Sequence, residues 1–222
     1  MNIIVFGATG GTGRAVMQVL LAQGHTVTAF ARRPAALSDA PGQRTVAGDA
    51  MNAEQVARAV AGHDAVVVSL GNSQDPFAKM FGAKRTTPAN ICEVGTRHIL
   101  AAMASGGIRR LVLVSAFGVG DTRARASWLN RLFFRLVLRE HMADKELQEA
   151  AVKASAADWT LVQPVALVDK PVLGQWTASN VGAIGGSMLS RTDLAAFIAL
   201  ELASPQHLRM TVTLSGATGR RA

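Results

Sequence analysis

The stretch Asn2-Ile3-Ile4-Val5-Phe6-Gly7-Ala8-Thr9-Gly10-Gly11-Thr12-Gly13-Arg14 decides the fold of this chain. Its apolar beginning predicts a strand, and its glycines predict a tight turn. Apolar residues then recur with helical spacing from Ala15 to Ala22, which predicts a helix. A glycine-rich hairpin is the alternative, but a helical period follows where a second strand would be needed. Strand, glycine turn and helix together favour dinucleotide binding.

The glycines of this turn have separate predicted roles. Gly7 allows backbone angles that a Cβ atom forbids, Gly10 lets a pyrophosphate approach the backbone, and Gly13 lets the helix pack closely on the strand. Backbone amides and the helix dipole attract anions at the start of the helix. The first gap is one residue longer than in the usual fingerprint. The predicted pyrophosphate-binding residues are Gly7, Thr9, Gly10, Gly11, Thr12, Gly13 and Arg14.

Composition predicts a single domain over residues 1–222 with a large core. Apolar residues make up 49% of the chain and charged residues 17%, which argues against disorder. The single cysteine, Cys92, excludes an intramolecular disulfide and fits a reducing compartment. The sequence begins without a signal-peptide pattern, and no run approaches the ~20 apolar residues that span a bilayer. We therefore expect a cytoplasmic protein without a membrane span, as a monomer or homodimer.

The net charge of +8 admits nucleic acid, an acidic membrane surface or small anions as partners. The basic residues form no polybasic tract, and tyrosine is absent. A base-stacking surface is therefore poorly supplied, and the pattern favours small anionic ligands over nucleic acid. No metal site is predicted.

Strands and helices alternate along nearly the whole chain, which predicts a doubly wound parallel sheet. A stretch rich in Gly, Ser, Val and Pro at 166–189 has no strong period and predicts a small substrate-side lobe. Residues 73–88 read as a surface loop that could cover a ligand, and 215–222 as a tail. The helix predicted at 127–139 carries a basic stripe, for which membrane attachment and core packing with a subunit or lid contact both stay open. The predicted strands lie at 2–6, 26–31, 45–47, 64–70, 111–114, 158–162 and 210–214.

Two arginines follow the second predicted strand, where NAD-binding folds usually carry a carboxylate for the ribose hydroxyls. A guanidinium at this position attracts a 2′-phosphate. Arg32 and Arg33, with Arg14 beside the glycine loop, therefore predict NADP(H) over NAD(H). Solvated loop arginines are the alternative.

Further candidates lie at the carboxyl ends of other strands, where ligands bind in open α/β sheets. Asp49 and Ala50 are predicted to flank the adenine; a turn or cap role is the alternative for Asp49. Ser115 is predicted beside the substrate or nicotinamide; a serine satisfying backbone groups is the alternative. The residues predicted to frame the nicotinamide are Leu70, Gly71, Pro164 and Val165, with Phe117 as a stacking wall for substrate.

The glycine loop, the Asp49 turn and the segments at 158–164 and 190–195 resemble the atypical short-chain dehydrogenase/reductases. The chain is most similar to their NmrA-like and flavin reductase (biliverdin reductase B) groups. The main branch of that superfamily uses a Tyr-x-x-x-Lys pair for acid–base chemistry. The matching positions here hold His141 and Lys145, and the chain has no tyrosine. An exposed helix histidine and a solvated lysine are the alternatives for this pair.

The resemblance implies an NADPH-dependent reductase that passes hydride to a flavin, quinone or related conjugated acceptor. Flavin reductases of this type also lack the tyrosine, because solvent can supply the proton once a conjugated acceptor has taken up hydride. Two other functions stay open. One is a redox sensor of the NmrA type that binds NADP(H) without turnover, and the other is an epimerase or isomerase.

Overall fold

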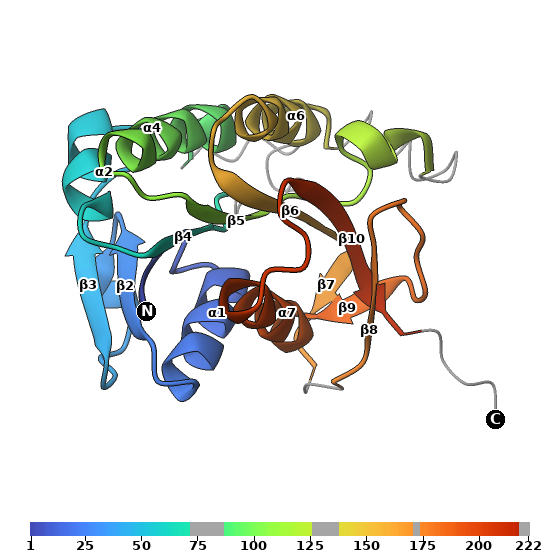
Figure 1. The fold of residues 1–222 in the computed structure, drawn as a ribbon, viewed down its shortest axis with the longest axis horizontal. Coiled ribbons are helices and arrows are strands. Elements are labelled where there is room, and N and C mark those ends of the chain that lie inside the picture. Colours follow the sequence, from blue (N-terminus) through green and yellow to red (C-terminus); the bar gives the residue numbers. More distant parts are fainter. Residues whose placement is uncertain (72–86, 126–137, 171–173, 218–222) are drawn as a thin grey trace, which may run out of the picture.

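The computed structural model describes residues 1–71, 87–125, 138–170 and 174–217 (Figure 1). The loop predicted at 73–88 and the helix predicted at 127–139 lie almost entirely outside these residues.

An eight-stranded sheet runs through the centre in the order β3-β2-β1-β4-β5-β6-β10-β8 (Figure 1). All its neighbouring strands are parallel except β10 and β8. The predicted doubly wound sheet is thus confirmed, with one antiparallel edge strand. The strands are β1 (Asn2–Phe6), β2 (Thr26–Ala31), β3 (Gln43–Ala47), β4 (Ala65–Val68), β5 (Arg110–Val114), β6 (Asp158–Pro164), β8 (Trp176–Ser179) and β10 (Met210–Gly216).

Helices cover both faces of this sheet (Figure 1). One face carries α1 (Gly11–Ala22) and α7 (Arg191–Ala203), and the other carries α2 (Ala53–Val60), α4 (Ile91–Ser105) and α6 (Arg139–Lys153). Side chains alternate between the faces, so Val5 joins the core beneath α1 and α7 while Phe6 joins the core on the opposite side. Burial on both faces explains why the strands read as nearly continuous apolar runs.

The segment after β6 is more regular than its sequence indicates. Short strands β7 (Ala166–Val168) and β9 (Met188–Ser190) pair in parallel, and β8 joins the edge of the main sheet. Ser215 and Gly216 pair with Thr177 and Trp176. The expectation that a tail begins at Ser215 was therefore wrong by two residues, because β8 extends the pairing of β10.

Side-chain caps position the helices that surround the sheet edge. Asn52 Oδ1 accepts a hydrogen bond from Gln55 N at 3.0 Å at the start of α2, as their spacing predicts. The carboxylate of Asp144, on α6, accepts from the amides of Cys92 and Glu93, both at 2.9 Å. Asp144 therefore ties the start of α4 to α6. Among the described helices, none is long and apolar enough to cross a membrane.

Candidate cofactor and active site

A cavity of about 340 Å³ lies where β1, β2, β3 and β4 end. The strand order reverses between β1 and β4, which pair while their sequence neighbours continue on opposite sides. Such a switch point is where open α/β sheets bind ligands. The lining residues include ten of the predicted cofactor-binding positions, namely Gly7, Thr9, Gly10, Arg14, Arg32, Arg33, Asp49, Ala50, Leu70 and Gly71. Phe30, Ala31, Ala36, Gly48, Ser69, Thr87 and Ile91, which our sequence analysis missed, complete the lining.

The packing of the protein itself explains two of the loop glycines, Gly7 and Gly13. Gly7 has φ +81°, and a Cβ atom there would lie 2.2 Å from Ser69 O. A Cβ atom on Gly13 would lie 2.2 Å from Gly7 O. Gly10 differs, since its φ is −75° and its Cβ would meet only Gly7 O, at 3.4 Å. The fold therefore leaves room for a side chain at Gly10, on the cavity wall.

Helix α1 begins at the cavity without a side-chain cap and without an acidic residue in its first turn. Its first amides are therefore available to an anion. Gly11, Thr12 and Gly13 belong to this turn but do not line the cavity. Above this first turn of α1 lies the positively charged side chain of Arg191, which the sequence does not place there. Arg191 Nε is 3.0 Å from the position of a Cβ atom on Gly11, and its Nη1 pairs with Asp169 Oδ1 at 2.7 Å.

Arg14 holds the two rims of the cavity together. Its Nε donates to Thr9 O at 3.0 Å, and its Nη2 donates to Ala36 O at 2.6 Å. Both acceptors are carbonyl groups, so the guanidinium charge is not neutralised by them.

Arg32 and Arg33 line the same cavity, at the end of β2. Arg32 Nη2 donates to Thr87 Oγ1 at 3.2 Å. Asp49 contributes the one carboxylate among the described lining residues, and its Oδ1 accepts from Met51 N at 3.0 Å. The predicted turn role of Asp49 is thus present, and the arginines give this end of the cavity a positive charge that suits a phosphate.

Three predicted catalytic residues gather where β4 and β5 end. Lys145 is 5% exposed, and its Nζ donates to Val114 O at 3.2 Å. His141 Cε1 lies 3.7 Å from the position of a Cβ atom on Gly71, in the cavity wall. Ser115 is 4% exposed and donates its amide to a β6 carbonyl. Neither Lys145 nor His141 is the solvated helix residue of the alternative, because α6 packs onto this end of the sheet.

Burial lowers the pKa of His141 from 6.5 to about 4, and the Lys145 charge adds to this effect. A lowered pKa means that the folded state binds the proton less readily than the unfolded state. His141 therefore supports stability above pH 6.5, and that contribution is lost as the pH falls towards 4.

We expect His141→Asn to weaken the pH dependence of the free energy of unfolding between about pH 4 and pH 6.5. The wild type should lose up to about tenfold in its folding equilibrium per pH unit through this one group, and the variant should not. Urea unfolding of both proteins across that range measures the difference. Parallel curves for the two proteins would contradict the assignment.

The remaining candidates lie further along the sheet edge. Phe117 donates its amide to Pro164 O at 3.0 Å, and its ring packs against the core beneath α1 and α7. Val165 is 8% exposed in the same core. Phe117, Pro164 and Val165 do not line the cavity. They lie beside it, at the ends of β5 and β6.

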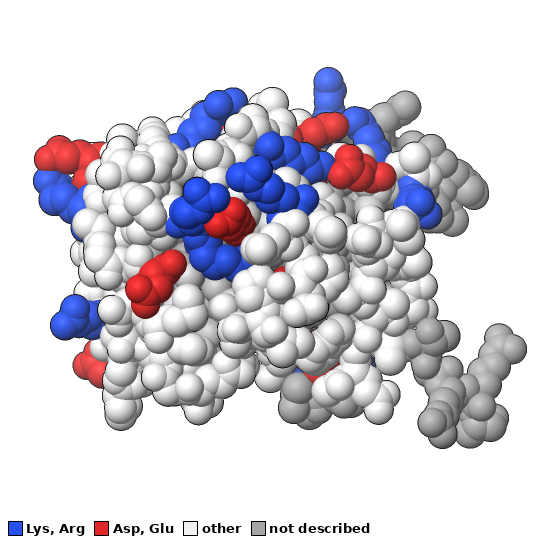
Figure 2. All heavy atoms as spheres, viewed as in Figure 1, with Lys and Arg blue, Asp and Glu red and all other residues white. Residues whose placement is uncertain are grey.

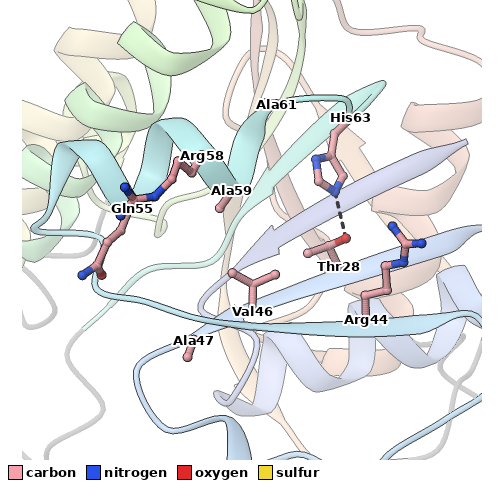
Figure 3. Close-up of a pocket in the computed structure, with 9 residues that line it drawn as sticks. All are labelled: Thr28, Arg44, Val46, Ala47, Gln55, Arg58, Ala59, Ala61 and His63. Atoms are coloured by element: carbon pink, nitrogen blue, oxygen red, sulfur yellow. Dashed lines mark hydrogen bonds between the residues drawn. The ribbon is translucent and has the colours of Figure 1, made fainter.

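A second pocket, of about 290 Å³, lies between β2, β3 and α2 (Figure 3). Its histidine is already satisfied: His63 Nε2 lies 2.8 Å from Thr28 Oγ1, and Nδ1 lies 3.1 Å from Val60 O. Its two arginines, Arg44 and Arg58, come from β3 and α2. This pocket lacks the strand-end loops that converge on the first cavity.

Neither the charge on the face shown in Figure 2 nor the metal-ligating residue types of the described ranges indicate another site. Basic and acidic side chains are interspersed on the face that Figure 2 displays, and much of its lower part is uncharged. Within the described ranges, no three His, Cys, Asp or Glu residues gather as metal ligands.

Comparison with known proteins places this arrangement in a family. A family described as NAD(P)H-binding matches residues 7–205. An uncharacterized chloroplastic protein of Arabidopsis thaliana is 28% identical, and the match covers 90% of this chain and 71% of the Arabidopsis protein. Three further curated relatives are 31–33% identical but match only 52–53% of this chain. The chain spans about a third of their length, 32–38%.

Solved structures share the fold. ChuY, an anaerobilin reductase from Escherichia coli O157:H7, has a TM-score of 0.79 and 24% identity, with all of both chains covered. A short-chain dehydrogenase/reductase from Veillonella parvula, solved in complex with NADP, has a TM-score of 0.79 and 16% identity, covering 96% of this chain and 94% of that one. The family match extends from the glycine loop to the end of α7. This chain is a member of the NAD(P)H-binding family.

Proposed function

We propose that the protein is an NADPH-dependent reductase that passes hydride to a flavin, a quinone or a related conjugated acceptor. The observation that carries the proposal is the cavity at the switch point, with an uncapped helix start on one side and three arginines around it. Membership of the NAD(P)H-binding family supports the cofactor class.

The residues present fit the cofactor along the whole edge of the sheet. The glycine loop and α1 would hold the pyrophosphate, and Arg14, Arg32 and Arg33 would hold the 2′-phosphate. Asp49 and Ala50 would flank the adenine. The positions left for the nicotinamide are Leu70, Gly71, Pro164, Val165 and Ser115.

The acid–base groups support the proposed class of acceptor. The chain has no tyrosine, and the lowered pKa of His141 leaves this residue as the neutral imidazole near neutral pH. A conjugated acceptor suits such a site, because it needs mainly a stacking surface and orientation. The reductase named among the structural neighbours supports the same reaction type.

The test is a panel of acceptors with purified protein. Loss of NADPH absorbance is followed with FMN, riboflavin and a small quinone, with NADH in parallel. We expect protein-dependent oxidation that is much faster with NADPH than with NADH. Tight NADPH binding without oxidation by any acceptor would favour the redox sensor, for which the missing tyrosine is the supporting feature. Conversion of a substrate without net loss of NADPH would favour an epimerase or isomerase.

A further inference from the structure

Thr87 lies at the end of the cavity where the 2′-phosphate of the cofactor is proposed to bind. It lines the cavity together with Arg32 and Arg33. Thr87 falls in the surface loop predicted at 73–88, yet the residue is only 3% exposed. Arg32 Nη2 donates a hydrogen bond to the Thr87 hydroxyl oxygen at 3.2 Å, across 55 residues of sequence. A buried hydroxyl thus contacts one of the arginines proposed to hold the 2′-phosphate.

This hydrogen bond restricts the far end of a long side chain. Arg32 follows directly after β2, so the sheet fixes its backbone. The arginine side chain has several rotatable bonds, and holding it in one conformation costs entropy. A fixed acceptor at Thr87 favours one position of the guanidinium before the cofactor binds, which reduces the entropy lost on binding. A guanidinium has five N–H donors, so a bond from Nη2 is compatible with further bonds to a phosphate.

Packed secondary structure adjoins Thr87 in the chain. Helix α4 begins four residues later, at Ile91, which is buried and lines the same cavity. The amides of Cys92 and Glu93, in the first turn of α4, donate to the carboxylate of Asp144 on α6. The acceptor for Arg32 therefore lies next to a helix whose start is fixed in position.

The Thr87 hydroxyl orients the guanidinium without neutralising it. A carboxylate in the same place would form an ion pair with Arg32 and would repel a phosphate group. Arg14, which lines the same cavity, is held in a comparable way, by the carbonyl oxygens of Thr9 and Ala36. The contact with Thr87 therefore leaves the positive charge of the Arg32 guanidinium intact.

We propose that Thr87 is a positioning residue for the 2′-phosphate. Its hydroxyl directs the Arg32 guanidinium towards this group and so raises the preference of the protein for NADPH over NADH. The inference rests on the proposed function, because it names a residue on which the proposed NADPH preference depends. NADH lacks the 2′-phosphate, so its affinity should not depend on the Thr87 hydroxyl.

The test compares the dissociation constants of NADPH and NADH by titration calorimetry. Thr87→Val keeps the shape of the side chain and removes the hydroxyl. We expect this variant to bind NADPH about 3–10-fold more weakly, with an unchanged Kd for NADH. Thr87→Ser keeps the hydroxyl and should keep the wild-type preference. Thr87→Ala, a second variant without the hydroxyl, should behave like Thr87→Val.

Thr96→Val is the matched control for Thr87→Val. Thr96 is another buried threonine, and its hydroxyl oxygen also accepts from a side-chain N–H, that of Gln148 Nε2, at 2.8 Å. This pair joins α4 to α6, and neither residue lines the cavity. The control variant loses a comparable hydrogen bond, and it should keep the wild-type ratio of the two Kd values.

A double-mutant cycle with Arg32→Leu completes the test. In Arg32→Leu protein the Thr87 hydroxyl has no guanidinium to direct, so adding Thr87→Val should leave the Kd for NADPH unchanged. A further loss in this background would overturn the role of Thr87 and leave the reductase proposal intact. Unchanged NADPH affinity in Thr87→Val, or equal losses for NADPH and NADH, would do the same.

Two results with the wild type concern the proposed function itself. Equal affinity for NADPH and NADH would overturn the NADPH preference and the role of Thr87 together. The binding measurements need no acceptor, so failure to oxidise NADPH, with the expected Kd values, would overturn the reductase proposal alone.

Discussion

The double variant Arg32→Glu/Arg33→Glu should bind NADPH about 10²-fold more weakly than the wild type, with little change in its affinity for NADH. Hydrogen bonds from a guanidinium to an anion contribute about 1.5–3 kcal/mol each, and the two glutamates would repel a 2′-phosphate. Both arginines line the cavity at the end of β2, and Asp49, the described carboxylate there, is engaged with Met51 N. Titration calorimetry with both nucleotides measures the change in selectivity.

Two controls separate the 2′-phosphate contact from other effects of these substitutions. Arg44→Glu makes the same type of charge reversal at one position on β3, at the second pocket, and should leave NADPH binding nearly unchanged. Thr87→Val removes the hydrogen bond that Arg32 donates to Thr87 while keeping the arginine. Equal loss of NADPH and NADH affinity in the double variant would contradict the proposed position of the 2′-phosphate.

Gly10→Ala should leave the protein folded and lower its affinity for both NADPH and NADH by about 10–10²-fold. The backbone at Gly10 has φ −75°, and an added Cβ would meet only Gly7 O, at 3.4 Å. An alanine is therefore compatible with the fold, but its methyl group would project where the pyrophosphate must approach. Forcing a methyl group into a tight contact is destabilising by about 1–3 kcal/mol, which corresponds to this loss of affinity.

Gly106→Ala is the matched control for this substitution. Gly106 has φ −89°, its Cβ would lie 3.3 Å from Ala102 O, and it ends α4 away from the cavity. The free energies of unfolding of Gly10→Ala and Gly106→Ala should both lie within about 1 kcal/mol of the wild-type value. Gly13→Ala should instead unfold far more easily, because its Cβ would lie 2.2 Å from Gly7 O. Unchanged nucleotide affinity in a folded Gly10→Ala protein would contradict the proposed position of the pyrophosphate.

The sequence predicts the fold and one half of the site because both depend on local signals. A strand, glycine turn and helix in immediate succession leave few possible backbone paths, and the carboxyl ends of parallel strands must meet at one edge. Arg32, Asp49 and Leu70, far apart in the chain, therefore converge on one cavity as predicted. The antiparallel edge strand β8 escaped prediction because its pairing with β10 is purely tertiary.

The position of the candidate catalytic residues depends on how α6 packs, which the local sequence pattern does not reveal. Lys145 and Glu149 read as charged residues of a surface helix, yet they are 5% and 2% exposed. Their four-residue spacing, continued by Lys153, was the available signal, since it marks one face of a helix. The position of Arg191 beside the glycine loop also depends on a tertiary contact. Helix α7 packs against α1, and this places Arg191, the first residue of α7, over Gly11.

In the proposed function, this cavity holds NADPH for transfer of hydride to a conjugated acceptor. The most direct test is an anaerobic single turnover, in which protein saturated with NADPH is mixed with an equal amount of riboflavin. We predict that NADPH absorbance and flavin colour disappear together, one for one, at a rate that depends on the protein and is lost in Arg32→Glu/Arg33→Glu at the same nucleotide concentration. Stable NADPH bound beside an unreduced acceptor, with riboflavin, FMN and the quinone alike, would contradict the claim.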